Sequence, residues 1–121
     1  MGNTSRLSAP DPDAAMRPLK WSSKEKTIAR RAFDQALARE LKTALRESKD
    51  MAAKIEEPSG LWELERFLTQ RHKEIDRKYD FRYSVLPFVF ANLLRDDRLT
   101  EDDLEGLPQD KLDLIRRIAS I

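Results

Sequence analysis

Cysteine is absent from the 121 residues of this chain, while histidine occurs once and glycine three times. A chain without cysteine forms no disulfide, no thiol nucleophile and no thiolate-ligated metal site. The single histidine, His72, lacks the further soft ligands that a metal site would need. The three glycines stand far apart, so no glycine-rich loop can hold a phosphate. We therefore predict a protein that is not an enzyme and that holds no cofactor.

Charge is plentiful but balanced. Lysine and arginine number 23 against 22 aspartates and glutamates, so the net charge is +1. No overall field draws such a chain to nucleic acid or to acidic lipid, and we expect neither nucleic-acid binding nor membrane insertion. The sequence has no apolar run long enough to span a bilayer and no signal-peptide core. Arg6 stands where a myristoylation signal needs serine or threonine, so the cytoplasm is the expected location.

The chain divides into a tail and one helical domain. Residues 1–21 carry Pro10, Pro12 and Pro18 among small and polar residues, and we predict that they form a disordered tail. The rest of the chain has helical periodicity and no strand pattern. We expect a single domain at residues 22–121, with long dimerising helices at 22–80 and a head at 81–121.

The first long helix is predicted at residues 23–56. Ser22 and Glu25 have the spacing of a capping box, and Pro58 stops the helix. Its apolar residues recur every three or four positions and therefore share one face. At 1.5 Å per residue the helix is about 50 Å long, whereas a compact domain of this size is about 28 Å across.

Part of this apolar face must therefore be covered from outside the protomer's own core. A second copy related by a two-fold axis is the simplest cover. The alternative is a lone amphipathic helix that only folds back on the next one. The second helix, predicted at residues 60–79 with Ser59 as its cap, carries Trp62 and Phe67 to either side of its apolar stripe and can face two neighbours.

The C-terminal part is predicted to form the head. Its first helix begins near Ser84, with Pro87 in the first turn, and ends near residue 94. This helix is apolar nearly all round, so either the head buries all of it or one phenylalanine is exposed. Thr100 and Asp103 form a second capping box for a short helix, and a last helix is predicted at residues 108–119.

The predicted fold class is thus all-α: an elongated helical dimer with long paired helices and a small helical head. Three strings within residues 61–94 refine this prediction. They read W-x-L-x-x-F-L from Trp62, R-x-x-E-I-D-x-K-Y-D from Arg71, and S-x-L-x-x-V-F from Ser84. In these residues the chain resembles the fluorescence recovery protein family, small all-helical regulators of the orange carotenoid protein in cyanobacterial photoprotection. The resemblance extends over about residues 22–119.

The resemblance implies a non-catalytic homodimer that binds the photoactivated orange carotenoid protein, or a related carotenoid-binding domain, and speeds its return to the resting state. Periodicity and resemblance together place these residues at the dimer interface: Phe33, Leu37, Leu41, Leu45 and Trp62. Candidate partner-binding residues are Arg66, His72, Phe88 and Lys111, the last offered only as a nearby cation of the head.

Two of these residues depart from the family pattern, which has an acidic residue at position 66 and an arginine at position 72. Arg66 and His72 make that patch potentially cationic. The departure indicates either a changed docking surface or a neutral re-pairing of surface charges. Two other functions therefore stay open: a relative that regulates a different protein, for example in stress signalling, and a helical DNA-binding regulator. The basic residues from Arg71 to Arg82 alternate with acids, which favours a solvated, self-paired helix face.

Overall fold

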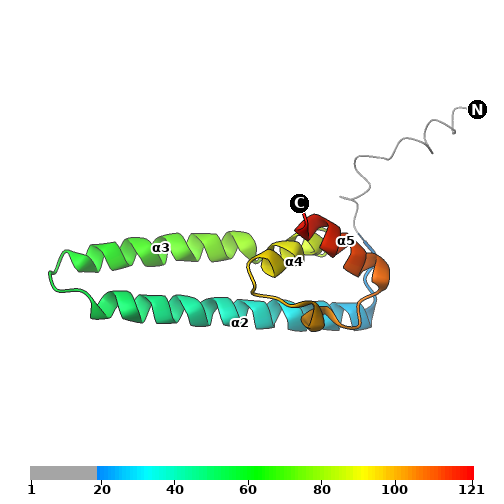
Figure 1. The fold of residues 1–121 in the computed structure, drawn as a ribbon, viewed down its shortest axis with the longest axis horizontal. Coiled ribbons are helices and arrows are strands. Elements are labelled where there is room, and N and C mark those ends of the chain that lie inside the picture. Colours follow the sequence, from blue (N-terminus) through cyan, green and yellow to red (C-terminus); the bar gives the residue numbers. More distant parts are fainter. Residues whose placement is uncertain (1–18) are drawn as a thin grey trace, which may run out of the picture.

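The computed structural model describes residues 19–121 and folds them into four α-helices and one short 3₁₀-helix. No strand occurs within these residues, so the predicted all-α class is confirmed. Helix α2 (Ser23–Ala53) and helix α3 (Gly60–Lys78) form a long antiparallel hairpin (Figure 1). Helix α4 (Leu86–Arg95), the 3₁₀-helix η2 (Glu101–Leu104) and helix α5 (Gln109–Ala119) gather at the end where α2 begins.

Both predicted capping boxes are present. The Ser22 hydroxyl accepts a hydrogen bond from the Glu25 amide at 3.1 Å, and the Glu25 carboxylate accepts one from the Ser22 amide at 3.3 Å. Thr100 and Asp103 make the same reciprocal pair at η2. These local bonds satisfy amides that have no partner inside the helix, which is why three-residue spacings in the sequence located the helix starts well.

The turn between the two long helices was predicted less well. Helix α2 has 31 residues and ends at Ala53, three positions before the predicted end. The Ser59 side chain makes no capping bond, because Ser59 already has helical dihedrals and the turn carbonyls accept from the first amides of α3. A Cβ at Gly60 would lie 2.9 Å from Ile55 Cγ2, so a larger residue here would require the Ile55 side chain to shift.

The core lies at the head end of the hairpin. It joins the first half of α2 to α4, to the loops around η2 and to α5, through these buried residues: Ile28, Ala29, Ala32, Phe33, Ala36, Leu86, Val89, Phe90, Ala91, Leu93, Leu99, Leu104, Leu107 and Ile115. The head is therefore not built from residues 81–121 alone, since α2 supplies one wall. Three of the α2 core residues are alanines that are fully buried, so this wall of the core is flat and most of the large side chains come from the head.

The boundary predicted for the tail is wrong at Trp21. This residue packs against the core, with its ring centroid 5.7 Å from that of Tyr83. The remaining part of the predicted tail, residues 1–18, lies outside the described residues. In α4, Phe90 is fully buried and Phe88 is partly buried, so the structure lies between the two alternatives predicted for this helix.

A buried carboxylate joins the hairpin to the head. Glu40 of α2 is 1% exposed and accepts hydrogen bonds from Lys78 Nζ at 2.6 Å and from the Tyr79 hydroxyl at 3.1 Å. Arg98, in the loop after α4, has its Nε 3.3 Å from the same carboxylate. Lys78 also pairs with Asp96 at 2.9 Å. One charge on α2 thus holds the end of α3 and the turn that follows α4.

The pKa values follow from this arrangement. Burial disfavours the charged form of Glu40, but the hydrogen bond and charge of Lys78, together with the charge of Arg98, hold its pKa below the ordinary value. Burial and the neighbouring Glu40 carboxylate raise the pKa of the Tyr79 hydroxyl. The site is therefore a neutral phenol beside an ionised, paired carboxylate, which is the arrangement that a buried charge requires.

Glu40→Ala should lower the free energy of unfolding by about 3 kcal/mol, because it removes the acceptor and leaves two cations facing each other in a partly buried site. Urea unfolding followed by circular dichroism, at one fixed protein concentration, measures this loss. Glu65→Ala is the matched control, since Glu65 is an exposed helical glutamate and its loss should cost about 0.5 kcal/mol or less. Equal losses in the two variants would contradict the role assigned to Glu40.

Candidate functional site

The part of the hairpin that lies outside the core carries large apolar side chains that are exposed to solvent. Leu41, Leu45, Leu61, Trp62 and Leu68 are between 46% and 60% exposed. The only other exposed large apolar residue in the described part of the chain is Ile121, at the C-terminus. An apolar set concentrated on one element marks an interaction surface more than scattered single residues would.

Four of these leucines lie on one side of the hairpin. The ion pairs Glu40–Lys78 and Glu47–Arg71 mark the lines along which α2 and α3 face each other. At about 100° per residue, Leu41 and Leu45 lie roughly a third of a turn round α2 from its line. Leu61 and Leu68 lie roughly a quarter of a turn round α3. Counted toward the C-terminus, the rotation has the same sense on α2 and on α3. Because the two helices run antiparallel, both rotations lead to the same side of the hairpin.

We call this set (Leu41, Leu45, Leu61 and Leu68) the apolar face. His72 lies on the same side of α3, while Trp62 points away from α2 at the outer edge. Arg66 lies further round α3 than Trp62, toward the side of the hairpin opposite the apolar face. The two residues that depart from the family pattern are therefore both exposed but do not share a face. His72 is 78% exposed, with Nε2 3.4 Å from Asp76, and no ion pair within residues 19–121 includes Arg66.

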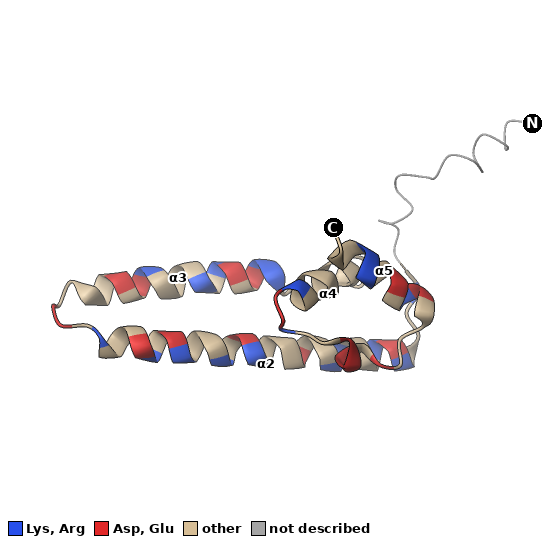
Figure 2. Ribbon diagram, in the orientation of Figure 1, with Lys and Arg blue, Asp and Glu red and all other residues tan. Residues whose placement is uncertain are grey.

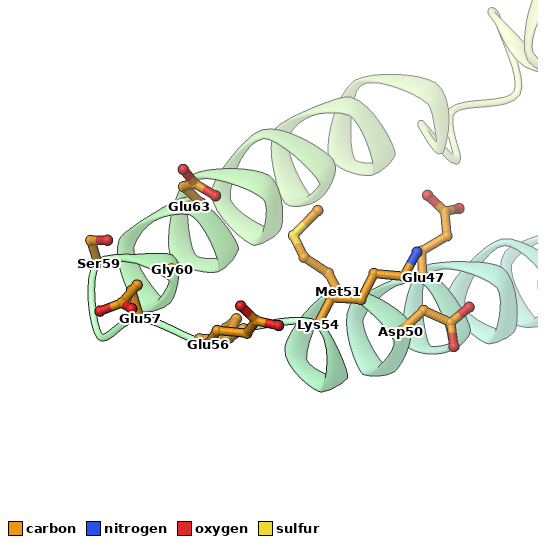
Figure 3. A pocket seen from close by; sticks show the side chains of 10 residues that line it. Glu47, Asp50, Met51, Lys54, Glu56, Glu57, Ser59, Gly60 and Glu63 are labelled. Atoms are coloured by element: carbon orange, nitrogen blue, oxygen red, sulfur yellow. The ribbon is translucent and has the colours of Figure 1, made fainter.

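The opposite side of the hairpin is hollow and acidic at its tip. A cavity of about 570 Å³ lies between the end of α2 and the start of α3 (Figure 3). Its floor is Met51 and Ile55, and its rim carries five carboxylates against one cation: Glu47, Asp50, Glu56, Glu57 and Glu63, with Lys54. No group of three metal-binding side chains is placed to hold an ion anywhere in the described residues.

Phe33 does not lie where the sequence placed it. It was predicted at the dimer interface but is 5% exposed and packs edge-on against Tyr79 and Phe81, at centroid distances of 5.5 and 4.9 Å. Leu37 is half-buried against the same core. The stripe on α2 thus divides: its first half serves the head, and Leu41 and Leu45 in its second half are left uncovered.

Lys111 is the second correction. The sequence offered it as a surface cation, but it is 7% exposed. Its Nζ donates to the Glu25 carboxylate at 2.6 Å and to the Lys20 carbonyl at 2.7 Å, and it lies 5.0 Å from the centroid of the Trp21 ring. The hydrogen bond from Lys111 is the main cause of the lowered pKa of Glu25. Lys111 therefore fastens α5 to the start of α2 and is not open to a partner.

The basic residues from Arg71 to Arg82 form the predicted self-paired face only in part. Arg71 pairs with Glu74 on its own helix at 3.7 Å and Arg82 with Asp80. Arg71 also pairs with Glu47 of α2, and Lys78 pairs with Glu40 and Asp96, so these two side chains are partly buried between elements. Sequence spacing finds only partners on the same helix, whereas here the closest acids come from α2 and from the turn after α4.

The apolar face could not be found in the sequence as a feature of two helices. Leu61 and Leu68 belong to the apolar stripe of residues 60–79, and nothing in the sequence separates them from core residues. Their exposure follows from pairing with the second half of α2, which has no head above it. The described part of the chain contains no helix with the length and apolar character needed to cross a membrane.

Comparison with known proteins gives consistent matches. The family model described as photoprotection regulator fluorescence recovery protein matches residues 21–119. The chain is 38% identical over 101 residues to the fluorescence recovery protein of Synechocystis sp., a match that covers 84% of this chain and 93% of that protein. The solved structures of the fluorescence recovery proteins of Fremyella diplosiphon and of Synechocystis sp. are 41% and 37% identical. Each has a TM-score of 0.79, with 84% of this chain and all of the other covered.

Lys111→Ala should lower the free energy of unfolding by about 2 kcal/mol, since a buried charged hydrogen bond to Glu25 is lost. Chemical denaturation of purified protein measures it. Arg66→Ala is the control, because this exposed arginine has no ion pair in the described chain and its loss should change stability by about 0.5 kcal/mol or less. A loss of stability in Lys111→Ala no larger than in the control would contradict the structural role assigned to Lys111.

Proposed function

The chain belongs to the photoprotection regulator fluorescence recovery protein family, and from this premise we propose that it binds the photoactivated orange carotenoid protein, or a related carotenoid-binding domain, and speeds its return to the resting state. The observation that carries the proposal is identity of 38% over nearly the whole length of a curated family member. Membership implies regulation of photoprotection, and the family is regulatory. A regulator of this kind acts by binding one conformation of its partner more tightly than another, without making a bond.

We further propose that the active form is a homodimer in which a second copy covers the apolar face. Leu41 and Leu45 are each about half exposed on a helix of 31 residues, and the head covers only the first half of that helix. Leu61 and Leu68 extend the same face across α3. Trp62 stands at its edge, where a flat aromatic ring can add contact area. An isologous pairing covers all of these side chains at once, because each copy presents the same face.

We propose Arg66, His72 and Phe88 as partner contacts on separate surfaces: Arg66 lies on the side of α3 away from the apolar face, and His72 lies at the border of the face that the second copy covers. The first two are exposed on α3, and Phe88 is the partly exposed phenylalanine of the head. Because the acid and the arginine of the family pattern are replaced at 66 and 72, a cyanobacterial orange carotenoid protein meets a different charge pattern here. That departure supports the second candidate, a family member that regulates a different protein partner.

Leu45→Glu should convert the dimer into monomers. In the dimer, a glutamate at this position would be buried without a partner, which costs several kcal/mol. A loss of that size in the free energy of association would dissociate a dimer of micromolar affinity. Multi-angle light scattering measures the mass at several concentrations. The control is Lys73→Glu, an exposed charge change on α3 away from the apolar face. A monomeric wild type at high concentration would refute the dimer, and an unchanged mass for Leu45→Glu would remove Leu45 from it.

Recovery of a photoactivated cyanobacterial orange carotenoid protein tests the function. We expect weak acceleration by the wild-type chain and stronger acceleration by Arg66→Asp combined with His72→Arg, because complementary charge raises association rate and specificity. The red-to-orange rate is the readout, and Arg117→Asp on α5 controls for a charge change elsewhere. Strong acceleration by the wild type would show that these positions do not set partner choice. No acceleration by either protein would favour a different partner.

A further inference from the structure

Aromatic rings form a continuous row beside the start of α2. The centroids of Trp21 and Tyr83 are 5.7 Å apart, those of Tyr83 and Phe81 are 5.4 Å apart, and those of Phe81 and Phe33 are 4.9 Å apart. Phe33 is buried, whereas the other three rings are only partly covered. The segment between α3 and α4 therefore runs along α2 with aromatic surface still exposed.

Two exposed cations of α2 lie over this row. The Arg30 guanidinium carbon is 4.5 Å from the centroid of Phe81, and Lys26 Nζ is 5.2 Å from that of Tyr83. Cations at these distances are attracted by the ring faces, which restricts long side chains that would otherwise sample many rotamers. Both cations are thus held in place before any partner arrives.

The charge around them is positive. Residues 24–34 contain four basic residues, Lys24, Lys26, Arg30 and Arg31, which we call the α2 cationic patch, against the acids Glu25 and Asp34. Glu25 is already paired with buried Lys111 at 2.6 Å. Asp34 is 3.3 Å from Arg30. No ion pair in the described part of the chain engages Lys24, Lys26 or Arg31.

A shallow groove follows the patch. Its volume is about 680 Å³, and it is lined by Lys26, Thr27, Arg30, Arg31, Asp34, Gln35 and Ala38. All of these residues belong to one exposed side of α2, so the groove is wide open, and the aliphatic stems of the cations with the small side chains of Thr27 and Ala38 give it an apolar surface. The groove continues the side of α2 that carries Leu41 and lies N-terminal to it, since Ala38 is one helical turn from Leu41.

We propose that the α2 cationic patch binds an acidic segment of a partner protein, with carboxylates on Lys26, Arg30 and Arg31 and an apolar side chain in the groove. This rests on the proposed function only for the identity of that partner. A protein segment fits better than a long polyanion, because the cations span only about 10 Å of helix. The acidic tip of the hairpin, red in Figure 2, lies too far along α2 to act on an anion bound at the patch, so the short span of the cations is what favours a protein segment.

A synthetic peptide of repeated Glu-Glu-Leu, titrated into the full-length protein labelled with ¹⁵N, tests the surface. We expect amide shifts confined to the start of α2 and to the segment around Phe81 and Tyr83, with affinity of about millimolar. Lys26→Gln combined with Arg31→Gln should weaken binding about fivefold, as two exposed ion pairs are lost. Arg30 is kept because it packs on Phe81. Both replacements are exposed, so unchanged circular dichroism is expected.

The control is Arg77→Gln combined with Arg117→Gln, which removes the same charge from exposed positions elsewhere. Equal weakening in the two double variants, shifts spread over all cations, or no binding at all would overturn the proposal. So would tighter binding of a short DNA duplex or of anionic vesicles at this patch. Patch shifts that appear on raising protein concentration without peptide would assign the surface to a second copy.

The same variants separate this inference from the proposed function. If wild type accelerates recovery of the orange carotenoid protein and Lys26→Gln with Arg31→Gln does not, the patch is the contact with that partner. A wild type that binds the peptide but has no effect on recovery would count against the proposed function while supporting the patch. A wild type that accelerates recovery undiminished by the double variant would overturn the patch as its docking surface.

Discussion

The position of the head depends on one buried carboxylate. Glu40 lies where the compact part of the molecule ends and the bare hairpin begins, and its hydrogen bonds and charge hold the end of α3 and the turn after α4. Arg39 next to it donates to the Arg98 carbonyl at 2.9 Å and to Asp103 at 2.7 Å, so η2 is fixed to the same stretch of α2. A charge with this many partners tolerates few alternative arrangements, since each would leave a polar group buried without a bond. The angle between the head and the hairpin is thereby defined.

The hairpin beyond that point has two unlike sides. One presents leucines to water, and the other has an acidic cavity at the tip. Neither side is needed to fold the head, since the core residues of α2 end at Ala36 and Glu40. Residues on a surface that does not pack against the core can be replaced without loss of the fold. Arg66 and His72, which differ from the family pattern, lie on this part of the hairpin. The start of α2 differs, because there the cations rest on rings that belong to the core.

Much of the fold was predictable because its signals are local. Each of these signals depends on a few neighbouring residues: the capping boxes at Ser22 and Thr100, the proline in α4 and the three- to four-residue period of α2. The helix starts that they predict agree with the structure. Contacts between distant residues were not predictable in this way. Phe33 and Leu41 belong to one apolar stripe, and only the path of the chain after α3, which brings Tyr79 and Phe81 onto Phe33, decides that the first is core and the second surface. Nothing in the sequence around Lys111 indicates that its partner is Glu25, which lies 86 positions earlier.

That last contact bears on how the protein is made. The first half of α2 is synthesised early, yet the side chains that cover it come from residues 86–115, and Lys111 bonds a carbonyl 91 positions before it. At ordinary translation rates of about 5–20 residues per second, roughly 5–20 s pass before these partners leave the ribosome. During that interval α2 and α3 can pair as a local hairpin, but Ile28 stays uncovered until the segment around Gly106 arrives. The final segment of the chain therefore completes the fold, and an interruption of synthesis before α5 would leave α4 without the helix that packs against it.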